Sequence, residues 1–303
     1  MKRKIVISIN SAWNIYNFRA GLIKALIKSG YEVLAVAPRD SYVEEITKMG
    51  VRFIPLEMDA KGINPFSEIL LLIRYFLILA KEKPSVFLGF TIKPNIYGSL
   101  VARILGIKFI NNVAGLGTLF SHRTVLCRLA ELMYKIGLSG SAKIYFQNKD
   151  DQKHFERKNI ISLQETELLP GSGVNLKHFS FSPLRHDEKS KRVRFILMAR
   201  MLWEKGIAEF VEAAKLLKQK YPHSEYCLLG FLDVQNPTAI SRKQMDQWVS
   251  EHSITYLGVS RDIRLHLKNA DCVVLPSFYR EGVPHSLLEG AAMGRPIVTS
   301  DSV

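Results

Sequence analysis

Two glutamates near the end of the chain have the type and spacing to bind a sugar. Glu281 and Glu289 are separated by seven residues in the segment 277–301, SFYREGVPHSLLEGAAMGRPIVTSD. Apolar runs typical of buried strands stand before and after it, so the segment between them is expected to form a loop and then a helix. With Ser286 as N-cap, the helix would end at Gly294 and carry Glu289 about one turn from its start. Both carboxylates would then face one crevice and accept hydrogen bonds from vicinal hydroxyl groups.

The start of the same helix is expected to bind a phosphate group. The first N–H groups of a helix have no partner within it and attract anions. We expect a diphosphate to lie against the loop residues Gly282, Val283, Pro284 and His285. Two glutamates on a helix are more often solvated surface residues, so the prediction depends on the residues around them.

A pair of cations precedes this segment. Arg200 and Lys205 lie in the loop RMLWEKG, between a strand at 193–199 and a helix at 207–220. Two cations beside a helix N-terminus would neutralise a diphosphate, although both could equally be surface cations. A strand at 226–229 ends at Gly230, in a loop where the nucleobase half of a nucleotide could lie.

The first half of the chain alternates strands and helices, which predicts a doubly wound parallel sheet. A strand at 5–9 is followed by a polar loop at 10–17 and a helix at 18–29 that contains Arg19. The loop lacks the G-x-G-x-x-G pattern of dinucleotide-binding folds. Further on, KPNIYG and a glycine loop follow two later strands, and the glycine loop by itself indicates only a tight turn.

The positive charge of the chain lies mainly in its first half. The 303 residues carry a formal net charge of +14. Residues 1–190 contain 27 Lys and Arg against 16 Asp and Glu, a net +11, and residues 191–303 contain 15 against 12, a net +3. A field of this sign attracts phosphates of nucleic acids or of anionic membranes. No RGG tract, zinc knuckle or basic helix with interleaved aromatics supports nucleic acid.

Neither the cysteines nor the histidines suggest a metal site. Cys127, Cys227 and Cys272 are odd in number, far apart and in apolar contexts, which indicates reduced core thiols. The eight His show no metal-binding spacing. A D-x-D pair that could hold Mg²⁺ is also missing.

An apolar helix is expected at 66–80. Its apolar runs are shorter than the roughly 18 to 20 residues that span a bilayer. It is either a buried packing helix or a helix whose apolar face partly lies on a membrane.

The segment 277–301 resembles the E-x7-E signature of the retaining glycosyltransferases of family 4, (S)-x-x-E-G-x-P-x-S-x-L-E-x-x-A-x-G-x-P-I-V-x-(S/T)-D. One departure is Gly290, where the family usually has Ala and where Gly weakens a helix by roughly 1 kcal/mol. By this resemblance Glu281 binds the hydroxyls of the donor sugar, Glu289 binds the ribose, and Arg200 and Lys205 neutralise the leaving nucleoside diphosphate without a metal ion.

The resemblance implies an α/β fold of the GT-B type, with two Rossmann-like doubly wound domains facing a cleft. The acceptor-binding domain is expected at 1–182, a polar linker at 183–192 and the nucleotide-sugar domain at 193–303. The KPNxYG and GLG elements resemble family members that act on polyprenyl-diphosphate-linked sugars. By this resemblance the residues on the acceptor side or in the cleft are Arg19, Lys93, Asn95, Gly115, Gly117 and His122. A single loop histidine such as His122 is more often incidental. Family members continue for several dozen residues beyond a position like Val303, so the sequence resembles a C-terminally truncated member whose activity is uncertain.

We therefore expect a metal-independent enzyme that moves a sugar from a UDP-sugar to a lipid-diphosphate-linked saccharide, peripherally on the cytoplasmic face of the plasma membrane. No cofactor and no nucleic-acid partner are expected. One alternative is a UDP-sugar 2-epimerase of the same fold, which would need further acid and base residues. The other is a basic protein without catalytic activity that binds a membrane surface or nucleic acid.

Overall fold

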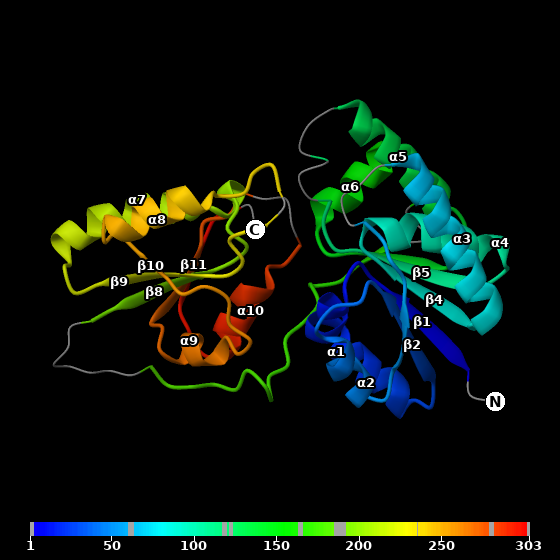
Figure 1. The fold of residues 1–303 in the computed structure, drawn as a ribbon, viewed down its shortest axis with the longest axis horizontal. Coiled ribbons are helices and arrows are strands. Elements are labelled where there is room, and N and C mark those ends of the chain that lie inside the picture. The colour runs from blue at the N-terminus through cyan, green and yellow to red at the C-terminus, as the bar shows by residue number, and fades with distance from the viewer. Residues whose placement is uncertain are drawn as a thin grey trace. The chain divides into compact units, whose positions relative to one another are not determined.

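The computed structural model divides into two units, Met1–Ser172 and Gly173–Val303, each built on one parallel sheet (Figure 1). The structure describes residues 3–59, 64–116, 120, 124–162, 166–184, 192–234, 236–278 and 282–301.

The first unit is a seven-stranded sheet in the order β3-β2-β1-β4-β5-β6-β7, and all neighbouring strands are parallel. The chain moves outward from β1 to β3, returns to the middle and then moves outward on the other side from β4. The order therefore reverses between β1 and β4, as the doubly wound prediction requires. The strands are β1 Lys4–Ser8, β2 Glu32–Ala37, β3 Arg52–Pro55, β4 Val86–Phe90, β5 Lys108–Val113, β6 Lys143–Phe146 and β7 Thr166–Leu168.

Helices cover both faces of this sheet, with α1 and α2 on one face and α3, α4 and α5 on the other (Figure 1). Alternation along the strands explains this, since neighbouring side chains point to opposite faces. In β1, Ile7 joins the core under α1 and α2, and Val6 joins the core under α3 and α4. The helices are α1 Ala12–Lys28, α2 Val43–Lys48, α3 Pro65–Glu82, the π-helix η1 Pro94–Gly98, α4 Ser99–Ile104, α5 Val125–Leu138 and α6 Lys149–Arg157.

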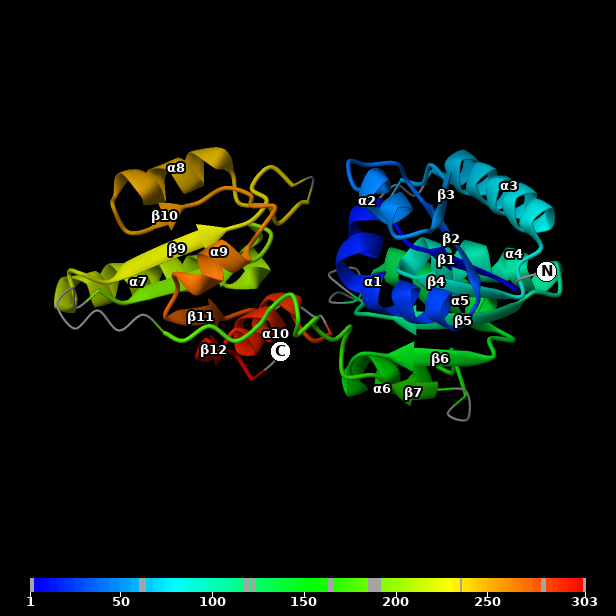
Figure 2. The same ribbon diagram turned by 90° about the horizontal axis from the view of Figure 1, so that it is seen from below.

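The second unit is a five-stranded parallel sheet in the order β10-β9-β8-β11-β12, which Figure 2 shows from β10 at one edge to β12 at the other. One core lies under α7 and α8, and a second contains residues of α9 and α10. The strands are β8 Arg194–Met198, β9 Glu225–Leu229, β10 Thr255–Tyr256, β11 Cys272–Leu275 and β12 Ile297–Thr299. The helices are the 3-10 turn η4 Trp203–Lys205, α7 Ile207–Lys220, α8 Arg242–Ser250, α9 Arg264–Lys268 and α10 His285–Ala292.

The division between the units falls before Gly173, whereas the sequence placed the end of the first domain at 182. Residues after Gly173 pack on the second sheet because Phe179 is part of the core around α9 and α10. Ser182 is also fixed there: its N–H donates to the carbonyl of Met293 at 3.3 Å, and its own carbonyl accepts from Arg295.

Two helix starts differ from the prediction. Helix α1 begins at Ala12 and not at 18, because the Ser11 side chain caps it by accepting from the Asn14 N–H at 3.1 Å. Helix α10 begins at His285 with Pro284 as N-cap, so Ser286 lies inside the helix.

Gly290 has a packing role that the sequence did not suggest. A Cβ there would lie 2.7 Å from Cγ2 of Val273 in β11, so glycine lets α10 approach the sheet.

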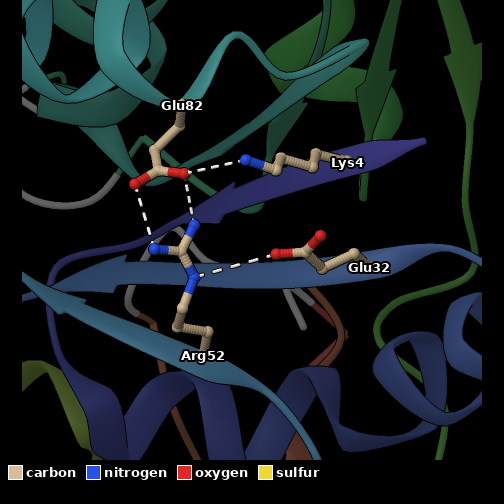
Figure 3. Close-up of polar contacts among 4 residues, drawn as sticks. All are labelled: Lys4, Glu32, Arg52 and Glu82. Atoms are coloured by element: carbon tan, nitrogen blue, oxygen red, sulfur yellow. Dashed lines mark hydrogen bonds and ion pairs between the residues drawn. The ribbon is translucent and has the colours of Figure 1, made fainter. Parts of the chain in front are cut away.

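A buried carboxylate at the amino edge of the first sheet is paired with two cations. Glu82, which is 7% exposed, accepts from Lys4 Nζ at 3.2 Å and from both terminal nitrogens of Arg52 (Figure 3). Glu32 lies 3.8 Å from Arg52 Nε. The Arg52 guanidinium holds the pKa of the Glu82 carboxyl below its usual range, against the opposite effect of burial.

The three cysteines of the chain, Cys127, Cys227 and Cys272, are free and buried.

Candidate functional site

Three loops meet at the carboxyl edge of the second sheet. They follow β8, β9 and β11, and β8 lies between the other two strands. The carbonyl of Glu204, after β8, accepts from the Phe278 N–H at 2.9 Å and from Ser277 Oγ at 3.2 Å, both after β11. On the other side, the Met201 N–H donates to the carbonyl of Phe231, after β9, at 2.8 Å. These bonds fix the loop that contains Arg200 and Lys205 between its two neighbours.

Glycine is required where these loops cross. Gly206, directly after Lys205, has φ of +73°, and a Cβ there would overlap the carbonyl of Pro276. Gly230 has φ of +144°, and a Cβ there would overlap the carbonyl of Ala199. The Gly230 carbonyl also accepts from the Tyr256 hydroxyl at 2.8 Å. Gly230 is therefore a steric requirement of the site, whatever ligand lies in the loop.

The two predicted cations have different surroundings. Arg200 is exposed at the end of β8, whereas Lys205 is buried in η4, just before α7 begins. Both lie at the strand-to-helix loop that the sequence predicted, and α7 has the predicted bounds. A helix N-terminus with two cations beside it is suited to an anion such as a diphosphate.

The structure brings Glu289 and His285 together, one turn apart on α10. Glu289 Oε1 lies 2.7 Å from His285 Nδ1, and both side chains are largely buried. This contact follows from the earlier helix start, because an i, i+4 pair faces the same side of a helix. Gly282 and Pro284 are buried and Val283 is exposed. Glu281, the other carboxylate of the pair, lies outside the described residues.

The predicted acceptor residues Lys93 and Asn95 are bonded within the first unit. Lys93 Nζ is paired with Glu68 of α3. Asn95 is fully buried: its Nδ2 donates to the carbonyl of Asn112 at 2.9 Å, and its Oδ1 accepts from Nδ2 of Asn111 at 3.0 Å. Asn95 therefore connects η1 to β5, and its amide is not available to a ligand.

The glycine loop after β5 is held by α6. Gly115 has φ of +142°, and the N–H of the next residue, Leu116, donates to Asp151 Oδ2 at 3.2 Å. Asp151 is itself buried and accepts from Asn148 Nδ2 at 2.9 Å. Two other predicted residues of this region, Gly117 and His122, lie outside the described residues.

Arg19 is buried in α1 beside the end of β4. Its guanidinium carbon lies 4.3 Å from the centre of the Phe90 ring. Nη1 donates to Ser172 Oγ at 2.8 Å and to the carbonyl of Phe18 at 3.2 Å, and the buried Nε has no hydrogen-bond partner among the described residues. Burial lowers the pKa of Arg19 to about 10, so the group stays charged at neutral pH.

The sequence did not identify four residues that shape these regions, Glu204 through its main-chain carbonyl and the other three through their side chains. Glu204 and Ser277 join two loops in the second unit, and Glu68 and Asp151 hold ligand candidates in the first. Glu204 lies inside the RMLWEKG motif, but the motif did not predict that its carbonyl binds the loop after β11. The other three are distant in sequence from the groups they contact, and no spacing points to them.

No metal centre is visible in the part of the chain that the structure describes: no three His, Cys, Asp or Glu side chains are grouped to hold an ion. The expectation of a metal-independent enzyme stays a prediction. Within the same residues, no helix has both the length and the apolar character to cross a membrane.

Two family models match the chain. Residues 4–148 match the model described as glycosyl transferase 4-like, and residues 192–303 match the model described as glycosyl transferases group 1. The two matches fall one on each sheet.

Individual proteins similar to the chain are also glycosyltransferases. The chain is 30% identical to N,N'-diacetylbacillosaminyl-diphospho-undecaprenol alpha-1,3-N-acetylgalactosaminyltransferase of Campylobacter jejuni, over 95% of this chain and 78% of that protein. It is 25% identical to UDP-Gal:alpha-D-GlcNAc-diphosphoundecaprenol alpha-1,3-galactosyltransferase of Escherichia coli, over 80% and 64%. Among solved structures, Anabaena HepE in complex with UDP-glucose matches with a TM-score of 0.76 at 14% identity, over 99% of this chain and 80% of that one. This last likeness shows the GT-B fold.

Proposed function

The chain belongs to the group 1, family 4-like glycosyltransferases, and from this membership we propose that it transfers a sugar from a UDP-sugar to a polyprenyl-diphosphate-linked saccharide with retention of configuration. One observation carries the proposal: the Campylobacter relative matches nearly the whole chain and is named for transfer to a diphospho-undecaprenol-linked sugar. The Escherichia coli relative, named for a UDP-galactose donor and a diphosphoundecaprenol-linked acceptor, supports the same reaction class.

In this proposal the carboxyl edge of the second sheet binds the donor. Arg200 and Lys205 neutralise the leaving diphosphate, and the N–H groups at the start of α10 bind it as well. Glu289, held by His285, accepts hydrogen bonds from the ribose, and Glu281 binds the hydroxyls of the sugar. Because Arg200 and Lys205 supply positive charge at the leaving group, the reaction needs no metal ion.

Transfer is favoured over epimerisation, because both family models and the named relatives are transferases. The test is to incubate the full chain with radiolabelled UDP-hexoses and UDP-N-acetylhexosamines and an undecaprenyl-diphosphate-linked saccharide. We expect label to enter the lipid fraction with one donor. Conversion of the UDP-sugar to its 2-epimer without acceptor would contradict transfer and support the alternative.

We also propose that the first unit lies on an anionic membrane surface, at the inner face of the plasma membrane. Helix α3 packs on the sheet with Leu71, Tyr75 and Leu79 and exposes apolar residues on its outer side. Helix α5, which packs on η1 and α4 as α3 does, exposes a second apolar stripe. The exposed side chains are Phe66, Ile69, Leu70, Ile73, Phe76 and Leu77 on α3 and Val125, Leu126, Leu129, Leu132 and Ile136 on α5.

The charges on these helices support an anionic partner. All three acidic residues of α3 and α5 are largely buried and paired: Glu68 with Lys93, Glu82 with Arg52 and Lys4, and Glu131 with Lys158 and His154. The basic residues Lys81, Arg128 and Lys135 are exposed. Each cation near an anionic surface contributes roughly 1 kcal/mol to binding.

Co-sedimentation with vesicles tests the membrane proposal. The protein should bind vesicles containing phosphatidylglycerol and leave them at high salt, and Leu129→Glu should weaken binding. The matched control is Leu216→Glu on α7, another exposed leucine, which should bind as the wild type does. Equal binding to neutral and anionic vesicles would contradict the proposal.

A further inference from the structure

Arg19 is a buried cation, and most of its N–H donors are unused among the described residues. Its side chain is 8% exposed, and burial is the only influence on its pKa, so no carboxylate in the described part of the chain acts on it. A guanidinium has five N–H donors. Within the part of the chain that the structure describes, both hydrogen bonds use Nη1, none uses Nη2, and Nε has no partner.

Two other arginines that join distant parts of the chain, Arg52 and Arg295, have more partners. Arg52 is paired with Glu82 and Glu32. Arg295, which is 3% exposed, has its Nε and both terminal nitrogens bonded to the carbonyls of Met293, Ala270 and Ser182. A buried charge without such partners is costly. Burying the Arg19 charge therefore costs free energy of folding, and a ligand that pairs with the charge would explain why the residue is there.

The location of Arg19 is where an open α/β sheet binds ligands. Arg19 follows β1 along the chain, and the Phe90 ring beneath its guanidinium ends β4. The strand order reverses between these two strands, and the crevice at such a point lies at the carboxyl edge of the sheet.

Polar side chains from the next strands extend the same edge. Ser172, which accepts from Arg19, lies 3.4 Å from Nε2 of Gln147, directly after β6. Gln147 Nε2 in turn lies 3.4 Å from Oδ1 of Asn112 in β5. This chain of contacts reaches Arg19 through Nη1 and orients the guanidinium. Protein atoms cover Nε, so Nη2, which has no hydrogen-bond partner among the described residues, is the nitrogen left for a ligand.

A guanidinium nitrogen donates a charge-assisted hydrogen bond to an oxygen of a phosphate or carboxylate. We propose that Arg19 binds a phosphate oxygen of a diphosphate ester through Nη2 at the carboxyl edge of the first sheet. The inference rests on the proposed function for the identity of the ester, which is either the lipid diphosphate of the acceptor or the diphosphate of the donor. Both have the same chemistry, and titration distinguishes them.

Binding is measured by calorimetry on the full chain at fixed ionic strength. Titration with UDP tests the donor, and titration with geranyl diphosphate in saturating UDP tests the acceptor. Arg19→Gln should raise the Kd of one of these ligands about 10- to 100-fold, as the loss of charged hydrogen bonds does. Arg19→Lys should give a smaller rise, because lysine keeps the charge and loses the planar, oriented donor groups of the guanidinium.

Arg103→Gln is the matched control, because it removes the same charge from an exposed arginine of the first unit. Its Kd values should stay within about 2-fold of the wild type. A rise equal to that of Arg19→Gln would mean that the loss of any one positive charge from the first unit accounts for the effect, and would overturn the inference. If Arg19→Gln fails to fold, Arg19→Lys provides the comparison.

The result also separates this inference from the proposed function. Unchanged affinity for both ligands in the Arg19 variants overturns the inference, even where the wild type transfers sugar. Diphosphate binding that depends on Arg19 in a protein that transfers no sugar supports the inference and contradicts the proposed function.

Discussion

The carboxyl edges of the two sheets use their predicted ligand residues differently. In the second unit the loops after β8, β9 and β11 are joined through main-chain carbonyl and N–H groups, and Arg200 is exposed there. In the first unit Lys93 is paired with Glu68, and both ends of the Asn95 amide are bonded to β5. A motif that fixes the backbone can thus leave its side chains available, as at Arg200, or use them to hold the fold, as at Asn95.

The largest effect is expected where the second edge depends on glycine. Gly230→Ala should destabilise the second unit by about 4 kcal/mol or more, because the Cβ overlaps Ala199 and the backbone lies at φ of +144°. Gly258→Ala is the control: its φ is +71° with nothing within 4 Å, so about 1–2 kcal/mol is expected. Thermal unfolding of both variants measures the difference, and equal melting temperatures would contradict the steric argument.

Arg200 and Lys205 test whether the second edge carries the chemistry. Replacing either by Ala should lower kcat about 100-fold, or about 3 kcal/mol, because the charge on the leaving group grows in the transition state. Lys205 is buried, so Lys205→Met, which keeps the volume, accompanies Lys205→Ala. Wild-type turnover in the variants of both residues would remove them from the mechanism.

Asn95 tests the claim that a predicted ligand residue of the first edge holds the fold and does not bind the acceptor. Asn95→Ala should lower the free energy of unfolding by about 2–3 kcal/mol, because it leaves the Asn111 amide and the Asn112 carbonyl with one partner fewer. Its effect on the acceptor KM should be small in the fraction that stays folded. An unchanged melting temperature with a raised acceptor KM would show that Asn95 contacts the acceptor, and the two edges would then be alike.

A smaller effect is expected at the amino edge of the first sheet. The folded-state pKa of Glu82 is lowered, first by its hydrogen bond to Arg52. Its contribution is therefore fully present above the unfolded pKa of about 4.3 and is lost as pH falls through the folded pKa. Glu82→Gln should cost about 1–3 kcal/mol at pH 7 and almost nothing well below pH 4. A loss that does not vary with pH would contradict the ion-pair assignment.

Much of the fold could be predicted, because it depends on apolar patterns within each element. The β1 and β8 strands and the bounds of α7 follow from such patterns. The start of α1 was missed because the polar run 10–17 was interpreted as a loop, although Ser11 caps a helix whose first turns are polar on one side. The start of α10 was missed for a similar reason, since Pro284 can end a loop as well as precede a helix.

The partners of the site residues were beyond sequence reasoning. Glu68 precedes Lys93 by 25 positions and Asn95 precedes Asn112 by 17, and no local pattern links either pair. Gly290 was interpreted as a weak point of a helix, yet the space it leaves is filled by Val273 of a neighbouring strand. Only the contact between His285 and Glu289 follows from spacing, once the helix is known to include both.

Titration of UDP tests most directly the claim that the donor binds at the second edge. Glu289→Gln should raise the Kd of UDP about 10-fold, or 1.4 kcal/mol, because it removes a charged acceptor of the ribose hydroxyls. Lys93→Ala, a charge removed from the first unit, should leave the Kd of UDP unchanged. The opposite result, with UDP bound normally by Glu289→Gln and weakly by Lys93→Ala, would contradict the account.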